Sequence, residues 1–105
     1  MTDAIVALST IDSEEEGLKI ARALIETHLA ACVNIVPKVT SVYEWKGEVC
    51  EEEELLLVIK TQKGRLNEIK ETLEALHPYD VPELIVLPIT DGLPDYLGWI
   101  FKNTK

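Results

Sequence analysis

Residues 31–60 set the architecture of this chain, and their sequence is ACVNIVPKVTSVYEWKGEVCEEEELLLVIK. Both halves contain many β-branched and aromatic residues, which favour strands, and the Lys-Gly pair at 46–47 suits a two-residue hairpin turn. We therefore predict a long antiparallel hairpin in which Tyr43 lies opposite Cys50. Pro37 cannot donate to the strand ladder, so we expect a bulge or bend at that position.

The length of this hairpin predicts an oligomer. An arm from Val33 to Trp45 would span roughly 40 Å at about 3.3 Å per residue. A compact domain of this size has a diameter of only roughly 33 Å, so one subunit cannot cover both arms. We expect the tip, with Tyr43 and Trp45, to lie on another subunit, and we interpret these aromatic residues as interface residues.

The segments on either side of the hairpin complete the fold. The apolar run at residues 4–8 predicts a central strand, and residues 13–29 have the spacing of an amphipathic helix that begins with a capping box. After the hairpin, Thr61 is placed to cap a second helix. A buried strand at 84–89 follows, and Pro94 suits the start of a short last helix.

The order of these elements predicts one α+β domain over residues 1–105. It is the βαββαβ order of a ferredoxin-like sandwich with an extra C-terminal helix. In that plan both central helices cover one face of an antiparallel sheet and leave the other face bare. The strands are nevertheless apolar throughout, which again indicates partner subunits.

Composition narrows the classes of function. The 105 residues have a formal net charge of −9, which disfavours nucleic acids and anionic membranes and makes cations the more plausible partners. No apolar run is long enough to span a membrane, and the first residues lack the pattern of a secretion signal. We therefore expect a cytoplasmic protein with reduced thiols at Cys32, a core residue, and Cys50.

The loop after the second predicted helix is the first candidate for a functional site. His77, Tyr79, Asp80 and Glu83 follow one another there, and no other part of the sequence has an imidazole, a phenol and two carboxylates so close together. Pro78 should end the helix at the preceding residue. His77 is open to two interpretations: it could bond the last carbonyls of that helix, or it could serve as a ligand.

Five ordered motifs carry a resemblance to a known family. They are LAACVN at 29–34, YEWKGE at 43–48, LVIKT at 57–61, HPYDVPE at 77–83 and YLGW at 96–99. Together they resemble the CutA family of divalent-cation tolerance proteins over almost the whole chain. The resemblance implies a ferredoxin-like homotrimer whose hairpins wrap neighbouring subunits. It also implies a role in the response to metal ions, with copper named most often.

The resemblance also implies a metal site. Its ligands would be His77 and Glu83, and some family members add a cysteine where this chain has Ser9. Because that soft ligand is missing, we expect only weak binding of a divalent ion, copper or zinc. No organic cofactor is expected.

Two other classes of function remain open. A trimeric signalling module like the PII proteins would bind a small anionic metabolite between subunits, near Lys60, Lys63 and Arg65, although this rests on fold analogy. Lys60 could instead pair with Glu83 or Asp80. An enzyme is the least favoured class, because the sequence has no nucleophile beside a base and no catalytic motif.

Overall fold

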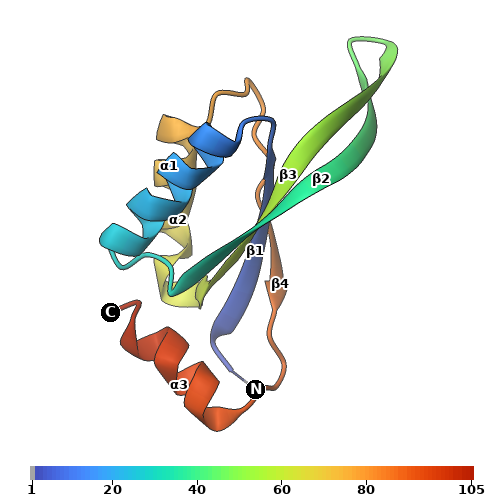
Figure 1. Cartoon of the computed structure of the whole chain (residues 1–105). Coiled ribbons are helices and arrows are strands. Elements are labelled where there is room, and N and C mark those ends of the chain that lie inside the picture. Colours follow the sequence, from blue (N-terminus) through green and yellow to red (C-terminus); the bar gives the residue numbers. More distant parts are fainter. Residues whose placement is uncertain (1) are drawn as a thin grey trace.

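The computed structural model describes residues 2–105 and confirms the predicted element order (Figure 1). Met1, which the single-domain prediction for residues 1–105 includes, lies outside the described residues. The elements are β1 (Ala4–Ile11), α1 (Glu14–Glu26), β2 (Cys32–Trp45), β3 (Glu48–Gln62), the 3-10 turn η1 (Lys63–Arg65), α2 (Leu66–Leu76), β4 (Ile85–Pro88) and α3 (Pro94–Lys102). The strands form one antiparallel sheet in the order β2-β3-β1-β4.

The hairpin has the register that its turn predicted. Tyr43 lies opposite Cys50, and the ladder shifts between Val36 and Val39, where Pro37 was expected to cause a bulge. The turn residues at 46–47 both have positive φ, 51° and 82°, as a type I′ turn requires. The right-handed twist of the two strands favours this turn, so the local sequence is sufficient to set the pairing.

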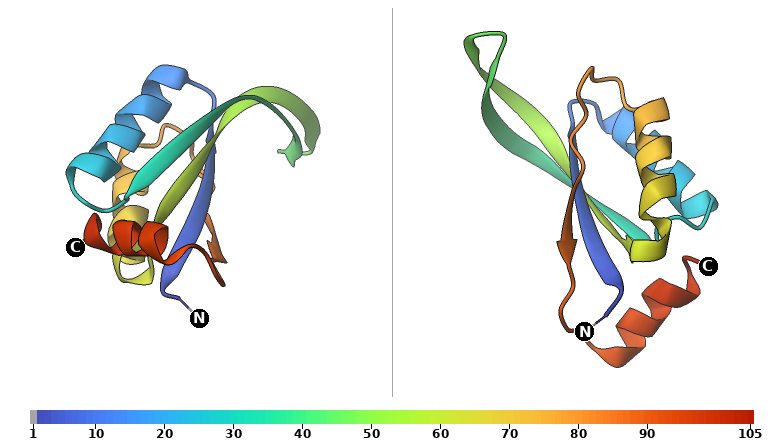
Figure 2. Two further views of the ribbon diagram at one scale, coloured as in Figure 1. Left: turned by 60° about the horizontal axis from the view of Figure 1, so that its bottom comes forward. Right: turned by 180° about the vertical axis from the view of Figure 1, so that it is seen from behind.

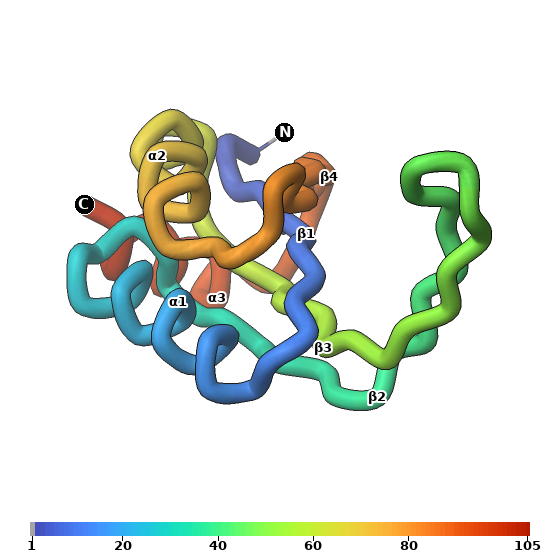
Figure 3. Tube along the Cα trace, turned by 90° about the horizontal axis from the view of Figure 1, so that it is seen from above, coloured from blue at the N-terminus to red at the C-terminus, as the bar shows by residue number. Residues whose placement is uncertain are grey.

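The hairpin extends well beyond the rest of the molecule. The principal extents are 45 × 25 × 22 Å, and the tip of β2 and β3 projects away from both central helices (Figures 1 and 3). Val42 and Val49 are 64% and 74% exposed, and Tyr43 and Trp45 are about two-fifths exposed. The single chain therefore leaves its hairpin aromatics without cover, in agreement with the argument from strand length.

The core lies between the sheet and the pair α1 and α2, which both cover the same face (Figure 2). Its buried members are Ala7, Ile11, Ile20, Leu24, Leu29, Ala30, Leu57, Ile59, Ile69 and Leu73. On the opposite face, Ile85 and Leu87 of β4 are half exposed. The predicted bare, apolar sheet face is thus present in the single chain.

Two element boundaries differ from the prediction by three residues each, whereas β4 is shorter by only one residue at each end. β1 continues to Ile11 rather than ending at residue 8, because Ser9 and Thr10 still pair with β3. α1 ends at Glu26, three residues early, because His28 takes a positive φ of 60° and the amides of the next two residues both donate to the carbonyl of Leu24.

The prediction that Thr61 caps the second helix is wrong. Thr61 belongs to β3, is fully buried, and donates its hydroxyl to the carbonyl oxygen of Leu29 at 2.6 Å. The chain enters α2 through η1, and no side chain caps the first turn of that element. A buried tertiary partner outweighed the local capping preference, because an unpaired buried hydroxyl would be costly.

Candidate functional site

The candidate site forms where the loop after α2 meets the far end of β1. Pro78 ends α2 as predicted: His77 has an extended backbone, with φ −77° and ψ 132°. β4 begins only at Ile85, opposite Leu8, so the last residues of β1 have no strand partner on that side. His77 fills part of this gap, because its Nε2 lies 2.8 Å from the carbonyl oxygen of Thr10.

The phase of the β1 ladder explains why this carbonyl needs a partner. At the other end of β1, the carbonyl of Ala4 accepts from the amide of Ile89, so even-numbered carbonyls of β1 point toward β4. Thr10 has the same phase, but β4 does not reach it. The imidazole therefore takes the place of a missing strand neighbour.

Both ring nitrogens of His77 are occupied. The backbone amide of Tyr79 lies 3.2 Å from Nδ1 and can only donate, so Nδ1 is the acceptor. Nε2 must then carry the hydrogen that it donates to Thr10. The residue is buried, with 7% exposure. The expected bond to the last carbonyls of α2 is not formed by this ring; a carbonyl of β1 takes its place.

Tyr79 connects the same loop to the base of the hairpin. Its ring meets the His77 ring edge-on at a centroid distance of 4.6 Å, and its hydroxyl donates to Oε2 of Glu54 at 2.6 Å. Glu54 is buried, although it belongs to a run of four glutamates in β3. Burial and then the bond to Glu54 raise the pKa of the Tyr79 phenol well above its usual value.

Glu83, the second predicted ligand, also reaches Thr10. Oγ1 of Thr10 donates to Oε1 of Glu83 over a long 3.4 Å, while the carbonyl of the same residue accepts from His77. The structure thus brings the predicted pair to one residue of β1. Within residues 2–105, however, no three His, Cys, Asp or Glu side chains are grouped so that they could hold a metal ion.

The ring as folded does not fit a metal ligand, because coordination needs a free lone pair and neither nitrogen of His77 has one. Glu83 is different: it is half-buried, and its one described hydrogen bond is long. The His77 and Glu83 ligand pair stays a prediction, with the carboxylate the better placed of the two.

Cys32 and Lys60 lie at the opposite end of the sheet. They face each other across β2 and β3, and Lys60 is also opposite Val6, four residues along β1 from Thr10. The ammonium of Lys60 lies 5.7 Å from the ring centroid of Tyr96, and it forms no ion pair with any residue from 2 to 105. The suggested pairing of Lys60 with a carboxylate of the loop is therefore wrong.

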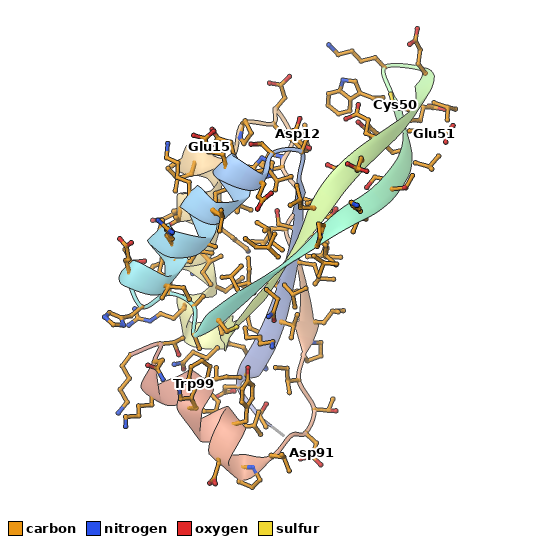
Figure 4. The ribbon with its side chains drawn as sticks, viewed as in Figure 1. Asp12, Glu15, Cys50, Glu51, Asp91 and Trp99 are labelled. Atoms are coloured by element: carbon orange, nitrogen blue, oxygen red, sulfur yellow. The ribbon has the colours of Figure 1, made fainter. Side chains whose placement is uncertain are left out.

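The remaining candidates are also separated. Arg65 donates to the carbonyl of Thr104 and to Glu68, so it is not free for an anion. Tyr43 and Trp45 lie near the hairpin tip, where Figure 4 labels Cys50 and Glu51, far from Trp99 on α3. The structure therefore divides the predicted site residues among three places: the His77 loop, the end of the sheet near α3, and the hairpin tip.

Comparison with known proteins assigns this chain to a family. Residues 5–103 match the family described as CutA1 divalent ion tolerance protein. The divalent-cation tolerance protein CutA of Thermus thermophilus is 54% identical over 99 residues, which cover 94% of this chain and 96% of that relative. This chain belongs to the CutA1 family. A mouse relative, Protein CutA, is 44% identical, but the aligned region is only 56% of its length.

Solved CutA1 structures have the same fold. The Thermus thermophilus protein superposes with a TM-score of 0.94 at 52% identity, covering 97% of this chain and 99% of that one. A protein described as periplasmic CutA from Archaeoglobus fulgidus gives 0.94 at 33% identity, with 97% and 99% coverage. One described as PII-like protein CutA from Nostoc gives 0.88 at 38%, with 96% and 97% coverage. None of the helices described here is long and apolar enough to cross a membrane.

Ser9 stands where the family resemblance places a cysteine in some members. It is fully buried, and its hydroxyl has no hydrogen-bond partner among residues 2–105. Successive side chains of a strand point to opposite faces, so Ser9 faces the helices while the Thr10 side chain faces away from them. A soft ligand at position 9 would therefore lie in the core and not beside Glu83.

Glu54 is the residue of this site that the sequence did not reveal. It is one of four consecutive glutamates in β3, and its partner Tyr79 is 25 positions away. No local pattern distinguishes it from its three neighbours. Only its place in β3 distinguishes it, because from Glu54 onward every residue of the strand is buried or half-buried, whereas the three glutamates before it are exposed.

Replacing Tyr79 with phenylalanine should lower the free energy of unfolding by about 1–2 kcal/mol at neutral pH, because a hydrogen bond to a carboxylate is lost. The raised Tyr79 pKa also predicts an alkaline effect. The unfolded phenol ionises near about pH 10 while the folded one stays protonated, so stability falls as the pH rises above that value.

Urea unfolding of the wild type and Tyr79→Phe between neutral pH and about pH 11 would measure this effect. The variant should lose less stability than the wild type on the alkaline side. Tyr96→Phe, on α3, is the matched control. Equal alkaline losses in the wild type and Tyr79→Phe would contradict the role given to this phenol.

Proposed function

We propose that this CutA1-family protein acts in divalent-cation tolerance in the cytoplasm and binds copper or zinc weakly as a homotrimer. The observation that carries the cation role is Glu83, a half-buried carboxylate whose hydrogen bond from Thr10 is long enough to be displaced. The net charge of −9 attracts cations to the whole surface. Binding should be weak, because no three ligands are grouped within residues 2–105.

The homotrimer is proposed from surfaces that a single chain leaves open. Tyr43 and Trp45 at the hairpin tip and Ile85 and Leu87 on β4 are all about two-fifths to one-half exposed. β2 also forms one edge of the sheet along its whole 14 residues. Long exposed edges and apolar faces of this kind are normally covered by another chain. The number of subunits comes from the family resemblance, which implies a trimer.

A PII-like role is the second candidate. Lys60 beside Tyr96 is the observation that favours it, since an ammonium near aromatic rings could hold an anionic metabolite at a subunit boundary. Arg65 already has protein partners, which weakens this candidate. No catalytic role is proposed, in keeping with relatives that are named for tolerance.

Calorimetric titration of the metal-stripped protein with copper, zinc and ATP would test the proposal. We expect saturable but weak metal binding that falls several-fold in Glu83→Gln, a variant of the same shape without the charge. Asp80→Gln, which removes an exposed carboxylate of the same loop, is the control and should change little. ATP binding without metal binding would favour the signalling role, and no metal binding at all would refute direct cation binding.

A further inference from the structure

We infer that His77 is a backbone clamp, and not the metal ligand that the family resemblance implies. In this role its neutral imidazole joins the loop after α2 to β1 and positions Tyr79 against Glu54. The inference is independent of the proposed function, because it concerns how this chain uses one side chain. It assigns His77 to positioning and leaves cation binding to carboxylates.

The two hydrogen bonds of the His77 ring leave no nitrogen free for a metal ion. A metal ion needs a lone pair on Nδ1 or Nε2 of a histidine. The lone pair of Nδ1 accepts from the amide of Tyr79, and Nε2 uses its hydrogen on the carbonyl of Thr10. A metal ion could gain either nitrogen only by breaking one of these bonds. Each break would leave a backbone group of a half-buried residue, Thr10 or Tyr79, without its protein partner beside a ring that is only 7% exposed, which opposes binding.

The clamp joins the end of β1 to the loop after α2. Thr10 lies 67 residues before His77, and its carbonyl has no β4 partner. His77 therefore connects the end of β1 to the loop where the sheet stops. Without the imidazole, that carbonyl would lose its protein partner, and the loop would keep only the long bond from Thr10 to Glu83 as a side-chain link to the end of β1.

Through Tyr79, the contacts of His77 extend to the base of the hairpin. Nδ1 of His77 accepts from the backbone amide of Tyr79, and the two rings pack edge-on. These contacts orient the backbone and the ring of Tyr79 so that its hydroxyl can donate to Glu54. Glu54 is 6% exposed and lies opposite Val39, beside the bulge from which the hairpin projects. The clamp therefore holds the partner of a buried carboxylate at the base of the hairpin.

Three variants separate a clamp from a ligand. His77→Asn keeps an acceptor near the position of Nδ1, His77→Gln keeps a donor near the position of Nε2, and His77→Ala keeps neither. A clamp predicts that the urea midpoint falls most in the alanine variant and less in the other two, while the copper and zinc dissociation constants of the asparagine and glutamine variants stay within twofold of the wild type. The exposed histidine provides a control, His28→Asn, because asparagine tolerates its positive φ.

Nitrogen NMR of the imidazoles in the metal-free protein gives an independent measurement. We expect the His77 ring to be in the Nε2–H form, with Nδ1 unprotonated. An Nδ1–H form would overturn the inference. So would a tenfold or larger loss of copper or zinc affinity in all three His77 variants with an unchanged urea midpoint.

A change in both stability and metal affinity would also distinguish a clamp from a ligand. If affinity falls in His77→Ala but returns in the asparagine and glutamine variants together with stability, the clamp is supported, because the effect on the metal is then indirect. If affinity stays low in all three variants whatever their stability, His77 is a ligand and the inference fails. A wild type that binds no metal would refute the proposed cation binding, while NMR and the urea midpoints would still test the clamp.

Discussion

Tyr43→Ala combined with Trp45→Ala should convert the proposed trimer to species of lower mass and lower the melting temperature by roughly 10 °C or more. Both side chains lie near the hairpin tip, where the single chain leaves them about two-fifths exposed. Buried aromatic residues at protein interfaces often contribute about 2 kcal/mol or more each. A shift of this size therefore requires that a partner covers them.

Light scattering coupled to gel filtration and a thermal melt, both at fixed protein concentration, would measure this effect. The matched control is Leu18→Ala with Ile25→Ala on α1, because these residues are 41% and 39% exposed, against 39% and 42% for Tyr43 and Trp45. The control pair should leave the mass unchanged and shift the melt much less. An unchanged mass and an unchanged melting temperature in the tip variant would contradict the prediction that the hairpin tip lies in a subunit interface.

Leu57→Ala should lower the free energy of unfolding by about 2–5 kcal/mol. Leu57 is fully buried in β3, on the sheet face that α1 and α2 cover, and it belongs to the single described core cluster. Truncation removes apolar contacts and leaves a cavity that close-packed neighbours can fill only in part.

Urea unfolding, at one protein concentration for all variants, is the measurement for Leu57→Ala. Leu18→Ala provides the control, since the same chemical change at a 41% exposed position should cost much less. Similar losses at the two positions would mean that Leu57 does not lie in the core.

Short-range chemistry explains what could be predicted at this site. The Pro78 ring restricts His77 to an extended backbone, so α2 ends where the sequence indicated. The hydroxyl of Ser13 accepts from the amide of Glu16, as the capping-box pattern predicted. At the candidate site, the loop with His77, Tyr79 and Glu83 could be selected from the sequence, but the hydrogen bonds that these residues make could not be predicted.

The sequence by itself determined the element order, the hairpin register and the bare sheet face, because turn geometry, proline restriction and apolar periodicity act between near neighbours. Only the tertiary structure decided that His77 bonds Thr10, that Tyr79 bonds Glu54 and that Lys60 lies near Tyr96. These partners are 67, 25 and 36 positions apart in the chain. Which of them meet depends on where β4 begins and how α3 packs, and buried polar groups take whichever partner folding brings within reach.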